Sequence, residues 1–352
     1  MSQFHSLKIG DIHKATDSCV VITFEVTEQL KSAFRFKAGQ YLAIKTHLDG
    51  NEIRRDYSIC SSPNSGKLQV AVKAVKGGYF SNFANTVLKA GDTLEVAAPN
   101  GRFVFEPNAL QSRTIMAFAA GSGITPVMSI MKTLLEEEPA STFVLMYGNK
   151  SPEDTIFFSE IEQLKTQYND RLKVHYVFSQ VEVDNALFGR IEKSTANFIL
   201  KNNYGGTAID QYYLCGPEPM IHAIKDMLLD QGTNSLQIHF ELFAVTTPAK
   251  PLPEDMLPEG KTKVTVILDD EETSFVMDPK KSVLEAALAE NLDPPYSCQG
   301  GICSSCLARL KEGEVKMRQN NILTDSEVEE GLILTCQSHP ITPSIKVDYD
   351  DV

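Results

Sequence analysis

The sequence lacks the features of membrane-spanning, secreted and nucleic-acid-binding proteins. Within its 352 residues no apolar run approaches the ~18 residues that cross a bilayer, and residues 1–5 contain no basic or apolar segment of a signal peptide. Lysine and arginine number 33 against 46 aspartate and glutamate residues, so the formal net charge is −13. This charge argues against nucleic acid or an anionic membrane as the main partner. We expect a cytoplasmic protein without membrane insertion.

Cysteine is scarce, and its placement argues against a disulfide framework. Three of the seven cysteines are scattered through the chain: Cys19, Cys60 and Cys215. The other four gather near the C-terminus: Cys298, Cys303, Cys306 and Cys336. An odd number of cysteines, clustered in a chain without a signal peptide, favours metal ligation over disulfide bonds.

Hydrophobic patterning predicts two different folds in the first 245 residues. Residues 1–107 contain short apolar strands separated by glycine turns, which indicates a small antiparallel β-barrel. Residues 108–245 alternate apolar strands, such as 114–120 and 143–147, with helical stretches such as 126–138. This alternation is typical of an α/β domain with a parallel sheet.

The remainder of the chain reads as a linker and a third domain. Residues 246–262 contain Pro248, Pro251, Pro253 and Pro258 and indicate an extended linker. Residues 263–352 hold 8 basic and 17 acidic residues, so this segment carries −9 of the net charge of −13. We therefore expect a separate, strongly acidic α+β domain, beginning with a hairpin (263–277) and a helix (282–290).

The C-terminal cysteines follow the pattern Cys-x4-Cys-x2-Cys, with the fourth cysteine after a gap of 29 residues. This pattern resembles the plant-type [2Fe–2S] ferredoxin signature over the whole of residues 263–352. The resemblance implies a β-grasp fold in which all four cysteines bind the cluster, and Gly300 and Gly301 let the loop backbone approach the sulfides. The alternative is a zinc site, but zinc pairs usually occur twice at similar spacing, and only one dense loop is present here.

A second motif indicates a flavin site. Arg55-Asp56-Tyr57-Ser58 resembles the R-x-Y-S motif of the ferredoxin–NADP⁺ reductase family, and residues 76–81 resemble that family's G-x-x-S turn. The resemblance implies that Arg55 binds the pyrophosphate, Tyr57 packs along the cofactor and Ser58 lies near flavin N5. It also implies flavin contacts from Val72, Lys73, Gly77, Gly78, Phe80 and Ser81. The resemblance favours FAD, and FMN is the alternative.

The nicotinamide loop of the same family is matched by residues 121–126. The glycine turn follows a buried strand and opens a helix, so backbone N–H groups and the helix N-terminus can stabilise a pyrophosphate. It departs from the Rossmann G-x-G-x-x-G pattern, because Pro126 occupies the third glycine position. The residues implied as nucleotide contacts are Gly121, Ser122, Gly123, Thr125 and Pro126.

Two further segments resemble elements around the nicotinamide ring. Cys215, Gly216 and Pro217 match the family's C-G-P segment, in which the cysteine lies beside the ring. Phe243 is the candidate aromatic that covers the flavin face, with Phe240 as the alternative. For Cys215 and both phenylalanines, a purely structural role in the core remains open.

The choice between NADPH and NADH depends on side chains after the second and third strands of the α/β domain. Lys150 and Ser179 are placed to bind a 2′-phosphate, whereas Gln180 stands where many NADP-specific relatives have arginine. No acidic residue stands there to bind the ribose hydroxyls of NADH. We favour NADPH, with NADH as the alternative.

The three motifs occur in the order flavin, nicotinamide, iron–sulfur cluster. Hydride delivers two electrons, flavin can release them singly, and a [2Fe–2S] cluster accepts one. The arrangement resembles the reductase components of bacterial multicomponent oxygenases, in particular those of ring-epoxidising di-iron systems. It implies an NAD(P)H-dependent electron-transfer enzyme whose partner is a di-iron oxygenase with a basic docking face.

Other functions remain open at this stage. The chain could serve another oxygenase, a hydroxylase or a fatty-acyl desaturase, or reduce a diffusible acceptor directly. It could also be a regulatory flavoprotein with a zinc-binding C-terminal domain.

Overall fold

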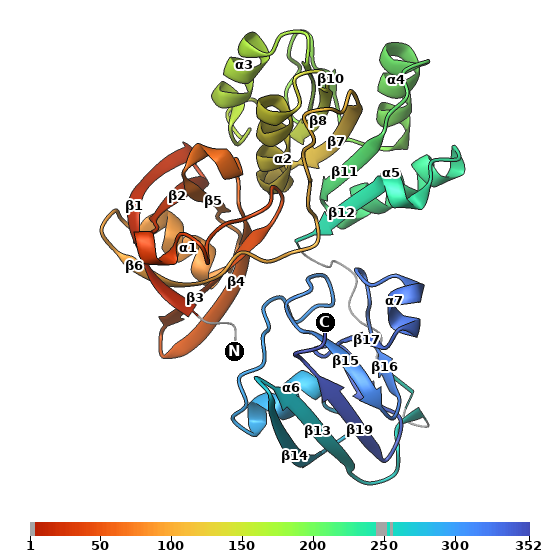
Figure 1. Cartoon of the computed structure of the whole chain (residues 1–352). Coiled ribbons are helices and arrows are strands. Elements are labelled where there is room, and N and C mark those ends of the chain that lie inside the picture. Colours follow the sequence, from red (N-terminus) through yellow and green to blue (C-terminus); the bar gives the residue numbers. More distant parts are fainter. Residues whose placement is uncertain (1–3, 244–251, 254–255) are drawn as a thin grey trace. The chain divides into compact units, whose positions relative to one another are not determined.

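The computed structural model describes residues 4–243, 252–253 and 256–352. It divides into two compact units, an N-terminal unit (residues 4–243) and a C-terminal unit that contains the described residues after 251 (Figure 1). Residues 246–251 and 254–255 of the expected linker (246–262) lie outside the described residues. In the described part of the chain, every helix is too short or too polar to cross a bilayer.

The first half of the N-terminal unit is a six-stranded antiparallel sheet in the order β4-β3-β6-β1-β2-β5. A bridge between Ile59 and Val70 joins its two edges, which closes the sheet into the expected barrel. The elements are β1 (Phe4–Thr16), β2 (Cys19–Glu25), η1 (Glu28–Leu30), β3 (Tyr41–Leu48), β4 (Asn51–Ser58), η2 (Pro63–Ser65), β5 (Leu68–Lys73), α1 (Tyr79–Thr86) and β6 (Thr93–Ala97).

The second half is a six-stranded sheet in the order β10-β9-β8-β7-β11-β12, with every neighbouring pair parallel. The elements are β7 (Thr114–Ala120), η3 (Gly121–Gly123), α2 (Ile124–Glu137), β8 (Thr142–Asn149), α3 (Phe158–Gln167), β9 (Leu172–Phe178), β10 (Leu187–Phe188), α4 (Lys193–Tyr204), β11 (Gln211–Gly216), α5 (Glu218–Asp230), η4 (Ser235–Gln237) and β12 (Ile238–Leu242). Because helices cover the sheet, its central strands carry long apolar runs, as in β7 from Ile115 to Ala120.

The expected parallel sheet is confirmed, with two corrections. The helix expected at 126–138 begins at Ile124 and ends at Glu137, because the glycine turn forms a 3-10 turn that leads directly into it. The sheet also contains β10 and β12, which were not expected. Both are short, and β10 has only two residues, so neither has a distinct hydrophobic period.

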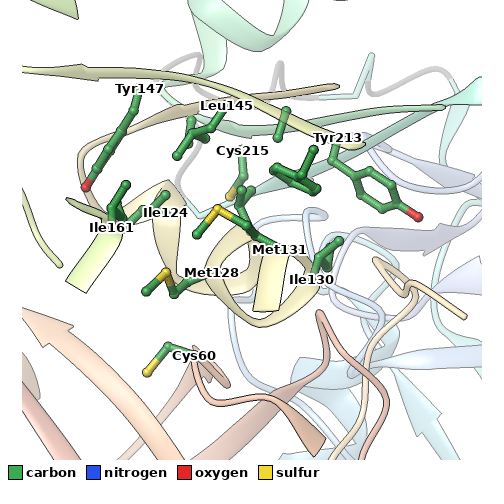
Figure 2. Close-up of a cluster of buried hydrophobic side chains, with 14 of the residues drawn as sticks. Cys60, Ile124, Met128, Ile130, Met131, Leu145, Tyr147, Ile161, Tyr213 and Cys215 are labelled. Carbon is green, nitrogen blue, oxygen red and sulfur yellow. The ribbon is translucent and has the colours of Figure 1, made fainter. Parts of the chain in front are cut away.

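One hydrophobic core joins the barrel to the parallel sheet. Cys60 of the barrel belongs to the same buried cluster as Ile124, Met128 and Met131 of α2 and Leu145 of β8. Figure 2 shows the α2 side chains between Cys60 and the strand residues. Because this shared core is apolar and fully buried, we expect the two halves to move together as one body.

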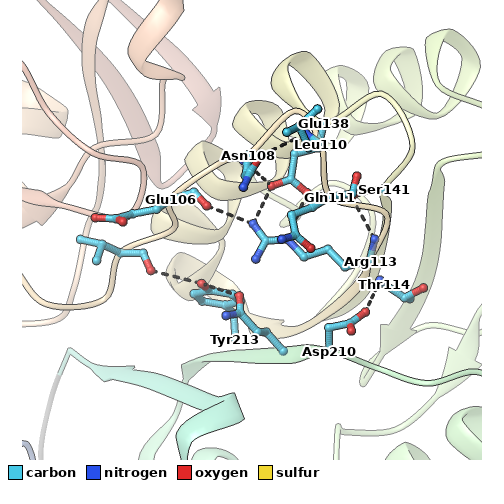
Figure 3. Close-up of polar contacts among 12 residues, drawn as sticks. Glu106, Asn108, Leu110, Gln111, Arg113, Thr114, Glu138, Ser141, Asp210 and Tyr213 are labelled. Atoms are coloured by element: carbon cyan, nitrogen blue, oxygen red, sulfur yellow. Dashed lines mark hydrogen bonds and ion pairs between the residues drawn. The ribbon is translucent and has the colours of Figure 1, made fainter.

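A polar network reinforces the connection between the two halves (Figure 3). Glu138 is fully buried and accepts hydrogen bonds from the Arg113 guanidinium, at 2.5 and 3.1 Å, and from the Ser141 hydroxyl. Arg113 also donates to the carbonyl of Glu106, and Asn108 N–H donates to Glu138. Burial opposes ionisation of Glu138, but these hydrogen bonds outweigh it and lower its pKa.

The C-terminal unit contains a five-stranded sheet in the order β14-β13-β19-β15-β17 and a small β16-β18 ribbon. Only β13 and β19 pair in parallel within that sheet, and α6 follows the leading hairpin, which gives the expected β-grasp arrangement. The elements are β13 (Thr262–Leu268), β14 (Glu271–Met277), α6 (Val283–Ala289), β15 (Leu307–Glu312), β16 (Val315–Met317), α7 (Asp325–Glu329), β17 (Leu332–Leu334), β18 (Ser338–Pro340) and β19 (Ser344–Asp348). Ser282 caps α6 in a capping box with Glu285.

Candidate functional site

The four C-terminal cysteines converge as two pairs. The thiols of Cys298 and Cys303 lie 3.0 Å apart on the loop before β15. Cys306, at the end of that loop, is hydrogen-bonded to Cys336, which follows β17. In the described residues no three His, Cys, Asp or Glu side chains are grouped so as to hold a metal ion. Two pairs are the arrangement that two irons sharing four thiolates require, so the residues fit a [2Fe–2S] cluster.

Backbone groups of the loop favour the ionised thiol. The Cys303 thiol, together with backbone N–H groups that include Gly300 and Ile302, lowers the pKa of Cys298 to about 6 against the effect of burial. Gly301 has φ +69°, and a Cβ there would lie 2.8 Å from the carbonyl oxygen of Gln319. The loop therefore depends on glycine at this position to keep its N–H groups directed at the sulfur atoms.

The flavin motif lies along β4 of the barrel. Arg55 is exposed, and its Nη1 donates to the carbonyl of Arg54 at 2.6 Å. The Tyr57 ring packs on Phe80 of α1, with the ring centroids 5.3 Å apart. An exposed arginine near two packed aromatic rings offers what a flavin nucleotide needs, a cation that can bind phosphate and an apolar surface.

The expected glycine turn directly precedes α1. Gly77 has φ +75° with open space beside it, and Gly78 is the N-cap residue. The buried Ser81 hydroxyl accepts a hydrogen bond from Val75 N–H at 3.3 Å and so fixes the turn. The first N–H groups of a helix lack intrahelical partners, so this turn fits a phosphate of the cofactor. Val72 lies in β5, buried in the barrel core.

Three side chains meet where the barrel joins the parallel sheet. The hydroxyl of Ser58, at the end of β4, donates to Oε2 of Glu241 at 3.1 Å. Glu241 on β12 lies opposite Cys215 on β11 in the strand register. Burial raises the pKa of Glu241 to about 8, and burial together with the neighbouring Glu241 carboxyl raises the pKa of the Cys215 thiol. Both groups therefore carry a proton at neutral pH.

The nicotinamide loop packs at Gly123 against the backbone of Cys215 and Gly216. A Cβ at Gly123 would collide with the carbonyl of Cys215 and lie 2.8 Å from the Gly216 nitrogen. Only a residue without a side chain lets α2 begin this close to the end of β11. The buried Thr125 hydroxyl donates to the carbonyl of Ser122 at 3.0 Å and holds the turn in place.

A cavity of about 440 Å³ lies at the carboxyl ends of the parallel strands. Three cationic side chains, Lys73, Lys150 and Arg190, line it together with the acidic Asp154 and Glu192. The other lining residues are Ala120, Gly121, Gly148, Asn149, Ser179, Gly189, Ile191, Pro217, Pro219, Met220 and Ala223. A crevice at this edge of a parallel sheet is where open α/β folds bind nucleotides.

Two of the residues that line the cavity were not predicted as nucleotide contacts, Lys73 and Arg190. Lys73, which we expected to contact the flavin, lies at the end of β5. Its Nζ would be 3.8 Å from a Cβ added at Gly121. Arg190 was missed, because it follows β10, a strand too short to be recognised. Lys150 and Ser179 both line the cavity, as expected for residues that follow β8 and β9.

The two aromatic candidates differ in their surroundings. Phe243, just after β12, is 42% exposed, whereas Phe240 lies under the Lys225 ammonium group, 4.6 Å from its ring centroid. An exposed ring next to Glu241 is free to cover a ligand, which favours Phe243. Glu241 itself is not among the site residues predicted from the sequence.

Family models match the chain in three places. Residues 6–105 match the oxidoreductase FAD-binding domain, residues 118–226 the oxidoreductase NAD-binding domain, and residues 266–340 the 2Fe-2S iron-sulfur cluster binding domain. These matches coincide with the flavin motif, the nucleotide cavity and the paired cysteines.

Curated relatives and a solved structure resemble the chain over nearly its whole length. It is 37% identical to one of the subunits of the 1,2-phenylacetyl-CoA epoxidase of Escherichia coli (strain K12), over 99% of both chains. It is 33% identical to the ferredoxin reductase component of 3-ketosteroid-9-alpha-monooxygenase from Mycolicibacterium smegmatis, over 98% of this chain and 97% of the relative. The structure of phthalate dioxygenase reductase, 26% identical, superposes with a TM-score of 0.60 over 98% of both chains.

Proposed function

We propose, from the premise that this chain belongs to the family of FAD- and [2Fe–2S]-containing reductase components of oxygenases, that it serves a di-iron epoxidase acting on phenylacetyl-CoA. The observation that carries the proposal is the 37% identity with a component of the phenylacetyl-CoA epoxidase over 99% of both chains. The reaction would belong to phenylacetate catabolism.

The electron-transfer activity of the protein follows from its FAD-binding, NAD-binding and 2Fe-2S domains. The chain is an NAD(P)H-dependent oxidoreductase that transfers electrons from the nicotinamide through FAD to a [2Fe–2S] cluster and on to an oxygenase component. FAD supplies the step from paired to single electrons. The chain's own residues bind and orient the cofactors and hold protons near the reacting atoms.

For the flavin, we assign Arg55 to the pyrophosphate, Tyr57 and Phe80 to the cofactor's apolar side, and Ser58 to the region of N5. The supporting contacts are the exposed guanidinium of Arg55 and the packing of Tyr57 on Phe80. The remaining assigned contacts are Val72, Gly77, Gly78 and Ser81. Glu241 accepts a hydrogen bond from the Ser58 hydroxyl, and its raised pKa favours a protonated carboxyl group at neutral pH.

For the nicotinamide nucleotide, the loop from residue 121 to residue 126 receives the pyrophosphate, with Lys73 supplying positive charge from the barrel. Cys215, Gly216 and Pro217 line the place of the ring, and Phe243 covers the flavin until the ring enters.

NADPH is the proposed electron donor, because three side chains of the cavity suit a 2′-phosphate. Lys150 and Ser179 follow adjacent strands, and Arg190 faces the same cavity. A hydrogen bond to a charged group contributes about 1.5–3 kcal/mol, so R190A should raise KM for NADPH roughly 10- to 100-fold. KM for NADH should stay unchanged.

Lys173→Ala is the matched control, because Lys173 belongs to β9 but lies outside this cavity. Steady-state flavin reduction with both nucleotides is the measurement. An equal rise in KM for NADPH and NADH in R190A would contradict the assignment of Arg190 to the 2′-phosphate.

For the cluster, we assign Cys298 and Cys303 to one iron and Cys306 and Cys336 to the other, following the two thiol pairs. The domain limits that accompany these assignments are 1–107 for FAD, 108–245 for the nucleotide, 246–262 for the linker and 263–352 for the cluster.

The partner is proposed to present a basic docking face, because residues 263–352 carry −9 of the chain's net charge of −13. Electron transfer to the partner should therefore slow as ionic strength rises, while hydride transfer at saturating NADPH should not.

The test is reconstitution with purified oxygenase components. With the remaining components of the E. coli phenylacetyl-CoA epoxidase, NADPH oxidation should be coupled to consumption of phenylacetyl-CoA. The oxygenase of the 3-ketosteroid system, whose reductase is 33% identical to this chain, is the comparison. Coupling with that oxygenase alone would replace the proposed substrate while leaving the reductase activity intact.

A further inference from the structure

Gln337 connects the two halves of the cluster site. It follows the ligand Cys336 and is only 4% exposed. Its Nε2 donates to the carbonyl oxygen of Gln299 at 2.8 Å and lies 3.8 Å from the Cys336 sulfur, within hydrogen-bond range of sulfur. One amide group therefore reaches both the loop that carries Cys298 and the remote fourth cysteine.

The backbone around Gln337 leaves its side chain little freedom. Its N–H donates to the carbonyl of Leu334, and its own carbonyl accepts from Arg318 N–H, both at 2.9 Å. The Cγ of Gln337 would lie 3.0 Å from a Cβ at Gly301, so the side chain packs directly on the ligand loop. Oε1 of Gln337 is buried without a hydrogen-bond partner among the described residues, so the contacts of Nε2 and the packing on the loop fix the direction of the amide.

The loop adopts a conformation that suits this contact. Gln299 has φ +51°, in the left-handed region that non-glycine residues seldom adopt. Its carbonyl accepts the hydrogen bond from Gln337. The contact thus stabilises a strained turn directly after Cys298.

We propose that Gln337 is a positioning residue that raises the reduction potential of the cluster by donating a hydrogen bond to the Cys336 sulfur and holding the ligand loop against it. The inference rests on the proposed assignment of the four cysteines as ligands. The reduced cluster carries one more negative charge than the oxidised one, so an N–H directed at a ligand sulfur stabilises the reduced form.

Backbone N–H groups donate to sulfur in both halves of the site, and Cys336 has a side-chain amide donor as well. Cys298 accepts from backbone N–H groups, such as that of Gly300 at 3.3 Å. Cys336 accepts from the backbone N–H of Gly301 and, in addition, has the side chain of Gln337. Substitution of Gln337 therefore removes one donor to Cys336 together with the contact to the Gln299 carbonyl, while the Gly301 N–H donor remains.

The experiment compares the intact holoprotein with two variants. Gln337→Met keeps the length of the side chain and removes the donor. Ser338→Ala is the matched control, because Ser338 is the next residue, is equally buried, and donates to the carbonyl of Leu334 at 2.9 Å. The midpoint potential of the cluster is measured by redox titration followed by electron paramagnetic resonance.

The expected result is a shift of the midpoint potential to more negative values and altered g-values in Q337M, with both unchanged in S338A. An unchanged potential in Q337M would overturn the proposal. If Q337M fails to retain iron, Q337L, which also removes the donor without adding charge, is titrated and should show the same direction of shift. Loss of the cluster from both Gln337 variants would also overturn it, because Gln337 would then have a purely structural role. Absence of iron and labile sulfide from the wild type would instead refute the ligand assignment.

Discussion

Gly123→Ala offers a sharp test of the geometry at the nicotinamide loop. Gly123 has φ −61° and ψ −9°, an ordinary conformation for alanine, so the substitution adds no backbone strain. The added methyl group would collide with the carbonyl of Cys215 and lie 2.8 Å from the Gly216 nitrogen. Since backbone cannot yield as a flexible side chain does, the loop must retreat from β11.

The required retreat is on the order of 1 Å, and displacement of reacting groups by that amount can cost about 100-fold in rate. We therefore expect G123A to reduce its flavin roughly 100-fold more slowly with NADPH. Flavin content, iron content and reduction by dithionite should remain normal. The rate is measured by anaerobic stopped-flow spectroscopy of the flavin absorbance.

Gly10→Ala is the matched control, because a Cβ at Gly10 would meet only the side chain of Glu25, which is exposed and can move. Its rate of flavin reduction should match that of the wild type. A wild-type rate in G123A would show that the contact between Gly123 and Cys215 does not position the nucleotide.

Three further predictions concern the flavin, the cluster and the core. Cys306→Ser should lose the cluster and cytochrome c reduction while keeping NADPH-driven reduction of ferricyanide, and equal loss of both activities would contradict separate redox centres. Arg55→Ala should be isolated with little flavin, so full occupancy by absorbance would exclude Arg55 as the phosphate anchor. Glu138→Gln should lower the free energy of unfolding by about 3 kcal/mol in urea, because Arg113 loses its buried counter-charge. Folding lowers the pKa of Glu138. The difference in free energy of unfolding between the wild type and E138Q should therefore be present above the pKa that Glu138 has in the unfolded chain, and it should vanish as pH falls through its pKa in the folded protein. A difference that does not depend on pH would refute this explanation.

The sequence predicted the elements whose signals are local. The spacing of the four cysteines, the R-x-Y-S motif and the glycine turns each lie within a few residues, and the strands that carry them have clear hydrophobic patterns. The barrel, the parallel sheet and the β-grasp domain were therefore predictable.

The features that were missed depend on contacts between distant segments. Glu241 meets Ser58 across 183 residues, and its role emerges only because β12 pairs with β11. Arg190 reaches the nucleotide cavity from the end of a two-residue strand. Lys73 lines the nucleotide cavity because β5 ends beside Gly121, a proximity that its place before the flavin turn in the sequence does not indicate.

The most direct measurement follows the electrons from NADPH through the flavin to the iron–sulfur cluster. Purified holoprotein is mixed anaerobically with NADPH, and the flavin absorbance and the electron paramagnetic resonance of the cluster are recorded on the same sample. If electrons pass from NADPH through the flavin to the cluster, the flavin absorbance should be lost first, and a reduced-cluster signal approaching about one unpaired electron per chain should follow. Flavin that becomes fully reduced beside a cluster that stays silent, in protein shown to contain iron and labile sulfide, would contradict it.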